Sequence, residues 1–501
     1  MRGIGFGLIG CAAVLLTACG GGGGGGSDLP AVEPNVSWVR DASGTGLFSE
    51  GTRVDARGPN NVITAVAHYP ELITLGAGTP TQTSLTCDGE YNAAVARYDD
   101  EGNLVWARKI GSVGQMFAEG VLTLNDGSCL VTGWFSGSAV FAEGLANETV
   151  LLPVSTWDGF LAKYSANGSF LWVRHIGPGG QGVRMAVLTD GTVGITFITW
   201  SESLTLNLGQ PDAITFDGLV MNEGAVAKYT TDGQVLWAER TQSTGYTTSW
   251  GIDALPGGGM VVASQYQGDT IFGKDGQAAD VSLSSLNGSV DTAVVAYGPN
   301  GNVLWARSVG GSQSDYGQEL ATSANGMVYV TGTYQEATTA GAESGAPQVL
   351  NAPGNFEATF LASYDAAGTF RWLRGAESPS SNRPRGITVF PDGAVGIAGG
   401  FTGDLVLGLG GPTMTTLSAT LWDGYVARYA PSGLLDWAVQ VSDEHFGEAF
   451  AASALTDNSL IVTGAYAGVG TWGAGDPNET TLSSVTPQAF YIARYNPDGG
   501  F

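Results

Sequence analysis

The chain has 501 residues, with 20 Lys and Arg against 46 Asp and Glu, and its formal net charge at pH 7 is −26. A surface this acidic repels phosphate backbones, so the composition argues against a nucleic-acid partner. A solvated surface that keeps the protein soluble explains the charge most simply. A surface that attracts cationic ligands is the alternative.

The N-terminus has the pattern of an export signal. Arg2 precedes an apolar run from Ile4 to Leu16, and small residues lead up to Cys19. About 13 apolar residues are too few to cross roughly 30 Å of hydrocarbon, which argues against a membrane helix. The residues Leu-Thr-Ala-Cys also resemble the bacterial lipobox, in which the Cys is lipidated. We therefore expect a signal peptide over residues 1–18, lipid attachment at Cys19, and an exported bacterial lipoprotein of the outer membrane or cell surface.

An unbroken glycine run from Gly20 to Gly26 follows Cys19. Glycines have no side chains that could pack into a core, so residues 19–34 are predicted to be a flexible tether. No later segment is long and apolar enough to span a membrane. Residues 35–501 are therefore expected to form one soluble body.

Two cysteines, Cys87 and Cys129, fall within this body. Thiols of an exported protein can pair, so a disulfide between them is one prediction. The repeat described below places them at opposite ends of neighbouring units, which favours two free thiols. The sequence leaves both alternatives open.

A unit of the form Tyr-x3-Gly-x3-Trp dominates the rest of the chain and returns every 65 to 68 residues. Self-similarity at a fixed period determines the architecture of a chain. The six complete copies are Tyr98/Gly102/Trp106, Tyr164/Gly168/Trp172, Tyr229/Gly233/Trp237, Tyr297/Gly301/Trp305, Tyr364/Gly368/Trp372 and Tyr429/Gly433/Trp437, and Tyr495/Gly499 begins a seventh.

Each period contains four short alternating or β-branched runs between turn residues, which predicts four strands. In the second period these runs are 120–124, 128–134, 159–164 and 169–174. Asx-Gly pairs such as Asp126-Gly127 and Asn167-Gly168 supply the positive φ of tight hairpins. A turn explains these acids better than a calcium loop, which needs six to eight ligands. No helical periodicity follows Cys19.

Four antiparallel strands per repeat predict an all-β fold, a seven-bladed β-propeller. The segment Asn35–Arg40 matches a fourth strand without a blade of its own, so we expect it to pair with the last three strands and close the ring. About 20 residues join the second and third strands of each repeat. Because strands alternate in direction, these insertions are expected on the face opposite the Asx-Gly turns, pointing away from the membrane.

The repeat resembles the bacterial seven-bladed β-propeller repeat family. The residues that carry the resemblance are Phe-Leu-Ala-Lys-Tyr-x3-Gly-x2-Leu-Trp at 160–172, the following Ile-Gly, and Asp-Gly-x2-Val-Thr-Gly motifs, over 35–501. The long insertions depart from the family pattern, as does Val295 in place of Ala. The resemblance implies architecture and says little about function.

Residues present in every blade are expected to do what every blade needs, so we assign the repeated Tyr, Gly and Trp to packing between blades. An aromatic ligand platform is the alternative. A second aromatic series ends the second strands and is also assigned to packing: His68-Tyr69, Phe135, Trp200, Tyr266, Tyr334, Phe401 and Tyr466.

The sequence contains no recognisable catalytic or metal-binding motif. The Gly-to-Trp spacing of four residues differs from the sialidase Asp-box. Tyr98 stands where quinoprotein-like propellers have Asp, so no cofactor is expected. The histidines are too few and scattered for a metal set. Candidate binding residues are the non-repeated Gln181, Asp315, Arg383, Arg385 and His445, together with Trp157 and Trp422, which either anchor loops or face a ligand.

These observations favour a monomeric, lipid-anchored propeller that binds or scaffolds without catalysis. Its partner is expected to be an envelope or extracellular protein or glycan. A polysaccharide-processing or other hydrolytic enzyme is one alternative, since 46 acidic residues allow a carboxylate pair. A structural or adhesive surface protein is the other.

Overall fold

The computed structural model describes residues 36–45, 50–56, 61–219, 222–273, 280–352, 356–443, 446–473, 479–484 and 488–497. Within these ranges the chain is all-β apart from short 3-10 turns such as η2 (Leu286–Gly288) and η3 (Ala342–Ser344). Cys19 and His445 lie outside the described residues. None of the described helical segments has the length and apolarity that a membrane span requires.

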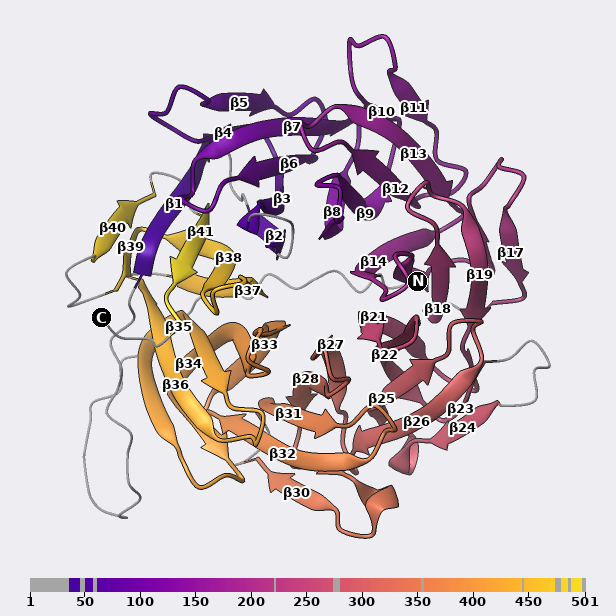
Figure 1. The fold of residues 1–501 in the computed structure, drawn as a ribbon, viewed down its shortest axis with the longest axis vertical. Helices are drawn as coiled ribbons and strands as arrows, with labels where there is room; N and C mark the ends of the chain where they lie inside the picture. Colours follow the sequence, from indigo (N-terminus) through magenta and orange to yellow (C-terminus); the bar gives the residue numbers. More distant parts are fainter. Residues whose placement is uncertain are drawn as a thin grey trace.

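The strands form four-stranded antiparallel units, named here by their innermost strand, and these surround a central axis (Figure 1). The expected order of strands within a repeat is confirmed. From the centre outward the units are β2 (Glu50–Asp55), β3 (Ile63–Tyr69), β6 (Asn92–Tyr98), β7 (Leu104–Ser112); β8 (Met116–Thr123), β9 (Cys129–Phe135), β12 (Asp158–Tyr164), β13 (Phe170–Ile176); β14 (Gly180–Val187), β15 (Val193–Thr199), β18 (Glu223–Tyr229), β19 (Val235–Arg240); β21 (Thr247–Leu255), β22 (Gly259–Gln267), β25 (Val290–Tyr297), β26 (Val303–Gly310); β27 (Tyr316–Thr322), β28 (Val328–Tyr334), β31 (Ala358–Tyr364), β32 (Phe370–Glu377); β33 (Ser381–Val389), β34 (Val395–Leu409), β35 (Thr415–Tyr429), β36 (Leu435–Asp443); and β37 (Phe446–Ala454), β38 (Leu460–Ala467), β41 (Ala489–Tyr495), β1 (Val36–Thr45).

The N-terminal strand β1 is the fourth strand of the β37 unit, as the sequence predicts. It pairs antiparallel with β41, with Trp38 opposite Arg494 and Ala42 opposite Phe490. Side chains also join the first and last units at the centre, where Ser453 Oγ accepts a hydrogen bond from the Ala56 amide at 2.9 Å. Segments from the two ends of the described chain are therefore held together by backbone and side-chain contacts.

The insertions between second and third strands are where the sequence expectation is wrong. They are not loops projecting from one face but hairpins along the outer rim, where β5, β11, β17, β24 and β30 lie (Figure 1). The strands of these hairpins are β4 (Leu72–Leu75) with β5 (Thr83–Thr86), β10 (Ala139–Phe141) with β11 (Thr149–Leu151), β16 (Ser203–Leu206) with β17 (Ile214–Asp217), β23 (Asp269–Phe272) with β24 (Val281–Ser284), β29 (Ala337–Ala340) with β30 (Gln348–Asn351), and β39 (Val469–Trp472) with β40 (Thr480–Ser483); in the β33 unit the hairpin continues β34 and β35.

Each hairpin spans two neighbouring units. In the β8 unit, β10 pairs with β7 of the preceding unit, Val140 lying opposite Gly111. The hairpin turn reaches the outer strand of its own unit, where Asn147 Nδ2 donates to the Phe170 carbonyl at 2.8 Å. Alternate side chains such as Phe141 are fully buried because they pack under the hairpin. This two-residue periodicity holds the insertion on the rim.

The repeated Trp lies at the junction between units, which confirms its predicted packing role. Trp106 Nε1 of the β2 unit donates to the Ala166 carbonyl in the β8 unit at 2.9 Å. The equivalent bonds run from Trp38 to Asp100, Trp237 to Pro299, Trp305 to Ala366, Trp372 to Pro431 and Trp437 to Pro497. The repeat therefore stabilises the contact with the next unit.

The repeated Gly faces the Trp of the preceding unit. Gly168 has a φ of 78°, and a methyl group there would lie 2.6 Å from Cδ2 of Trp106. Arg108 completes the contact, because its Nε donates to the Gly168 carbonyl at 2.8 Å and its guanidinium lies over the Trp106 ring. Glycine is needed both for the left-handed turn and for the close approach of the ring.

The second aromatic series is mostly buried, as expected, but Trp200 is 42 % exposed. Cys87 and Cys129 are both free, which is the alternative that their positions in the repeat favour. Cys129 is buried at the start of β9, whereas Cys87 follows the rim strand β5 and its Sγ donates to the Gly89 carbonyl. The rim hairpin places Cys87 at the outer edge of the molecule. Cys129 lies elsewhere, at the beginning of β9 and next to the Asp126-Gly127 turn.

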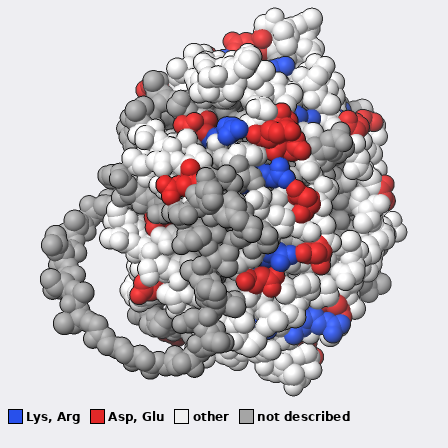
Figure 2. Space-filling view, turned by 60° about the vertical axis from the view of Figure 1, so that its left-hand side comes forward, with Lys and Arg blue, Asp and Glu red and all other residues white. Residues whose placement is uncertain are grey.

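Acidic side chains predominate on the face shown in Figure 2, and many basic side chains there lie beside acidic ones. Partly exposed ion pairs such as Arg371 with Asp365 at 2.6 Å have the same arrangement. Pairs of this kind contribute at most about 1 kcal/mol each. They lower the local net charge of the surface but contribute little to the stability of the fold.

Candidate functional site

The candidate site is a cavity at the centre of the molecule. Its volume is about 160 Å³, and residues of β2, β8, β14, β21, β27, β33 and β37 line it. Every unit thus contributes its innermost strand. The innermost strands occupy equivalent positions in their units. Side chains that are not the same in every unit therefore determine the polarity and charge of the cavity wall.

Each innermost strand has a register shift against its neighbour at the same place. The shifts fall between Gly51 and Arg53, Ala118 and Gly120, Gly182 and Arg184, Ser249 and Ile252, Gly317 and Glu319, Pro384 and Gly386, and Ala449 and Ala451. β-Bulges redirect side chains and recur beside functional sites. After the shift, three units carry Arg53, Arg184 and Glu319, and others carry Gly120, Gly386 and Ala451, which leave room for them.

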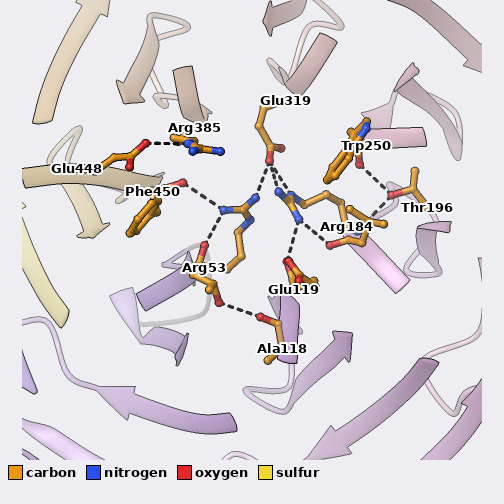
Figure 3. Close-up of polar contacts among 12 residues, drawn as sticks. Arg53, Ala118, Glu119, Arg184, Thr196, Trp250, Glu319, Arg385, Glu448 and Phe450 are labelled. Carbon is orange, nitrogen blue, oxygen red and sulfur yellow. Dashed lines mark hydrogen bonds and ion pairs between the residues drawn. The ribbon is translucent and has the colours of Figure 1, made fainter. Parts of the chain in front are cut away.

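The two arginines converge on one carboxylate oxygen (Figure 3). Glu319 Oε1 accepts hydrogen bonds from Arg184 Nε at 2.7 Å and from Arg53 Nη2 at 3.1 Å, and Arg184 Nη2 lies 2.6 Å away. The three side chains are only 11–20 % exposed. The Arg53–Glu319–Arg184 cluster therefore joins the β2, β14 and β27 units across the centre.

Backbone carbonyls fix both guanidinium groups. Arg184 Nη1 donates to the Glu119 carbonyl at 2.9 Å, and Arg53 Nη1 donates to the Phe450 carbonyl at 3.2 Å (Figure 3). Burial raises the pKa of Glu319, and the positive charge of Arg184 opposes that rise. Two cations share one carboxylate here, so the cluster carries excess positive charge inside an acidic protein.

One predicted binding residue, Arg385, lines the cavity beside this cluster. Its Nε donates to Glu448 Oε1 at 2.8 Å. The cavity wall also contains Asp55 and Asp253, whose carboxylates accept hydrogen bonds from the amides of Thr123 and Thr322 in the next unit. Both acids thus also connect neighbouring units.

The other predicted residues lie apart from the cavity. Gln181 Oε1 is 3.5 Å from Nε1 of Trp200. Arg383 forms an ion pair with Glu357 at 3.0 Å. Asp315 is fully buried, where its Oδ2 accepts a hydrogen bond from the Gly311 amide at 2.9 Å.

Burial of Asp315 raises its pKa to about 8, with a smaller contribution from the charge of Asp291. Burial also raises the pKa of Asp291 to about 6. A carboxyl that is fully buried does not contact a partner at the surface. Asp315 therefore belongs to the interior of the protein, in contrast to the sequence expectation.

Trp157 and Trp422 share a Trp-Asp-Gly pattern but differ in environment. Trp157 is 41 % exposed. Trp422 is half-buried and packs over Gly400, where a methyl group would lie 2.4 Å from the indole Nε1. The sequence allowed these tryptophans either to anchor a loop or to face a ligand. The packing of Trp422 fits the first role, and the exposure of Trp157 fits the second.

Trp157 is the exposed end of an aromatic row formed by Tyr91, Phe117, Trp134 and Trp157. The ring centroids are 5.3 Å apart for Tyr91 and Phe117, 4.6 Å for Phe117 and Trp134, and 6.5 Å for Trp134 and Trp157. All four lie at strand ends opposite the Asx-Gly turns. Exposed Val113 and Val154 lie close to them in the sequence.

A buried carboxylate holds the loop that carries Trp157. Asp158 accepts hydrogen bonds from the Val154 amide at 2.7 Å and the Ser155 hydroxyl at 2.8 Å, and His175 Nε2 lies 2.7 Å from it. These bonds lower the pKa of Asp158 despite its burial. Ser155 and His175 both contact Asp158, and the Ser155 hydroxyl donates to the carboxylate, so the trio lacks the Ser–His hydrogen bond of a nucleophilic triad.

Sequence reasoning missed Arg53, Arg184 and Glu319. Their signal is visible once the repeats are aligned on the first strand, because three of the other four repeats have a small residue at the same position and the fourth has Ile252. Within the described residues, no group of three or more His, Cys, Asp or Glu is placed to hold a metal ion.

No family model matches the chain. It is 21 % identical over 448 residues to an uncharacterized WD repeat-containing protein of Acanthamoeba polyphaga mimivirus, a match that covers 76 % of this chain and 32 % of the relative. The chain therefore matches about a third of that relative's length. With the radial four-stranded units, this similarity decides the architecture. The chain is a β-propeller repeat protein.

Similar solved structures include the Neurospora crassa Pan2 WD40 domain, at 10 % identity and a TM-score of 0.34, covering 76 % of this chain and 89 % of that one. A Bacillus licheniformis rhamnogalacturonan lyase is 10 % identical with a TM-score of 0.28, covering 92 % and 91 %.

Proposed function

We propose that this propeller is a lipid-anchored, non-catalytic binding module of the bacterial cell envelope, of the seven-bladed repeat type. The pairing of β1 with β41 supports a seventh blade completed by the N-terminal strand. The Leu-Thr-Ala-Cys19 sequence supports the anchor. Exported bacterial repeat proteins of this kind are the family that the sequence resembles.

The aromatic row is the observation that carries the binding role. Trp157 keeps 41 % of its surface exposed on a loop whose conformation is fixed by the hydrogen bonds of Asp158. Exposed apolar side chains that gather in one place mark interaction sites, and a rigid aromatic ring loses little entropy on binding. Envelope glycans and envelope proteins are the partners proposed for this surface.

Binding to isolated envelope material tests the role of the aromatic row. Trp157→Ala should reduce binding of the purified soluble body to envelope glycan or envelope protein fractions by about tenfold, as for loss of an aromatic anchor. Trp200→Ala is the matched control, because Trp200 is 42 % exposed and lies outside the row. Equal losses in the two variants, or none in either, would refute a binding role for the row.

The anchor is tested separately with the full-length precursor. Cys19→Ser should abolish partitioning into a detergent phase, because no thiol remains at that position for lipid attachment. Retention of the variant in the detergent phase would contradict the lipoprotein assignment. The Ser155, Asp158 and His175 group does not support a hydrolytic role, because Asp158 binds both the Ser155 hydroxyl and the His175 imidazole and lies between them.

A further inference from the structure

The rim strand β11 forms a free edge of its sheet. Among the described residues it pairs with β10 alone, where Val150 lies opposite Val140. The outer side of an edge strand presents unpaired backbone N–H and C=O groups, which can pair with a strand from another chain. The strands β5, β17, β24, β30 and β40 are edges of the same kind. The side chains on these edges therefore decide which of them favours a partner.

The outward side chains of β11 are apolar. Val150 and Leu152 are 48 % and 65 % exposed, and Val154, the next alternate residue, is 61 % exposed. The equivalent exposed pairs in the other rim hairpins are Ser84 and Thr86, Thr215 and Asp217, Ser282 and Ser284, Val349 and Asn351, Thr416 and Ser418, and Thr481 and Ser483. Among these described hairpins, β11 alone has an apolar side chain at both positions.

No charged side chain protects this edge. Natural edge strands are commonly shielded by charged residues, by proline or by a covering element. Residues 149–157 contain no charged residue, and the carboxylate of Asp158 is buried in its own loop. Pro153 has no N–H, so it limits the segment available for pairing to residues 149–152. Figure 1 shows the β10–β11 hairpin projecting from the rim, where a partner can reach it.

The free edge leads into the aromatic row of the proposed binding surface. The Val154 amide donates to the Asp158 carboxylate at 2.7 Å, and Trp157 lies on the same loop. Val113 is 66 % exposed, and its amide donates to the Ser138 carbonyl at 3.3 Å beside the beginning of β10. Exposed apolar side chains thus run from β11 through this loop to the aromatic row.

The backbone edge and the alternating side chains select an extended protein segment as the occupant. An added strand pairs its amides and carbonyls with those of β11, and its own alternate side chains contact Val150 and Leu152. A glycan has no regular row of amide and carbonyl groups at the spacing of a strand. A second copy of this chain would bring the same net charge of −26 to the interface, and like charges repel.

We propose that an extended segment of a partner protein, with apolar side chains at alternate positions, adds as a strand to the free edge of β11. This inference rests on the proposed binding function and names the class of its partner. Main-chain hydrogen bonds supply the affinity of such an interface, and Val150 and Leu152 supply its preference for apolar side chains.

A labelled peptide of alternating Val and Thr, with Lys at both ends, is the probe. The same peptide with every Val and Thr amide N-methylated is its control. Fluorescence anisotropy with the full soluble body should show binding of the first peptide with a Kd below about 1 mM. The control should bind about tenfold or more weakly, because it cannot donate the hydrogen bonds of an added strand. Equal binding of the two peptides, or no binding of the first up to about 1 mM, would overturn the proposal.

A double variant tests the side chains. Val150→Thr with Leu152→Thr gives β11 the polar pattern of the other hairpins, and Thr keeps a high preference for strands. The double variant should bind the probe about tenfold more weakly. Val349→Thr is the matched control, because Val349 is 52 % exposed at the equivalent position of β30, and this substitution should leave the affinity unchanged. Equal losses in the two proteins would contradict a site at β11.

Two further measurements separate this inference from its alternatives. Sedimentation that shows a dimer of the wild type, and a monomer of the double variant, would overturn the proposal, since a second copy would then occupy the edge. Binding to envelope material that Trp157→Ala weakens and the double variant leaves unchanged would also overturn it, while the binding role of the aromatic row would stand. A loss in the double variant that is confined to the envelope protein fraction is the expected result.

Discussion

At the scale of single residues, the centre of this propeller contrasts with its surface. Arg53, Arg184 and Glu319 are mostly buried, and each comes from a different unit. Surface pairs such as Arg383 with Glu357 are more exposed, at 43 % and 25 %. The same pair of charges should therefore matter for stability at the centre and very little at the surface.

Glu319→Ala tests this difference. It leaves two buried guanidinium groups without their shared carboxylate, and breaking a buried pair in this way costs about 3–5 kcal/mol. Glu357→Ala, which breaks the exposed pair, should cost less than about 1 kcal/mol. Urea unfolding followed by circular dichroism measures both. A cost below that of the control would show that the cluster does not hold the units together.

Asp315 gives the protein a stability that depends on pH. Its pKa is raised to about 8 by burial, whereas an unfolded Asp titrates near about 3.9. The folded state therefore binds the proton more tightly, and this contribution is present below pH 4 and lost as the pH rises through 8. Facing groups are Asp291, Thr338 and Gly311.

The expected result is a free energy of unfolding that decreases between pH 5 and 9, and a flatter profile for Asp315→Asn. Urea titrations at several pH values measure it. Asp365→Asn is the control. Hydrogen bonds from Thr369 and Arg371 lower the pKa of the partly exposed Asp365, so its contribution to stability changes only below about pH 4. A variant Asp315→Asn with the wild-type slope would contradict the assignment.

At the scale of elements, the contact between units depends on the Trp, Arg and Gly of the repeat. Gly168→Ala would force a methyl group against Trp106 in addition to the strain of a positive φ. Gly191 has a φ of 83° with nothing within 4 Å of its missing side chain, so Gly191→Ala isolates the strain.

Gly191→Ala should therefore cost about 1–2 kcal/mol, and Gly168→Ala about 1–3 kcal/mol more. Unfolding in urea measures the two costs. A shift in tryptophan fluorescence is expected only for Gly168→Ala, because only that substitution displaces an indole. Equal costs and unchanged fluorescence in both variants would show that the Gly–Trp contact is unimportant.

At the scale of the whole molecule, we expect stability to depend on the pairing of β1 with β41, which joins segments from the two ends of the described chain. Trp38 on β1 donates to the Asp100 carbonyl at 3.0 Å, and β1 covers the edge of β41. Deletion of residues 35–40 should expose that edge, lower the melting temperature and promote oligomers, since unpaired strand edges associate. Deletion of Gly20–Gly26 is the control and should change neither property. Calorimetry and size-exclusion chromatography measure both, and an unchanged monomer after the first deletion would contradict closure by β1.

The sequence by itself determined the strand order within each repeat, the partner of β1 and the packing role of the repeated Trp. These follow from period-two apolarity, Asx-Gly turns and the fixed spacing, all of which are local properties of the chain. Trp106 and Gly168 are a clear example. Each copy of the motif supplies a Trp that contacts the next unit and a Gly that contacts the Trp of the preceding unit.

Only the tertiary structure decided how the insertions fold and which residues meet at the centre. The insertions pair with the preceding unit, as Val140 does with Gly111. Their position therefore depends on a neighbouring strand that the sequence pattern of the insertion does not identify. Arg53 and Glu319 are 266 residues apart in sequence. Their contact exists because the radial arrangement brings equivalent positions of different units to one axis, and no local pattern encodes that distance.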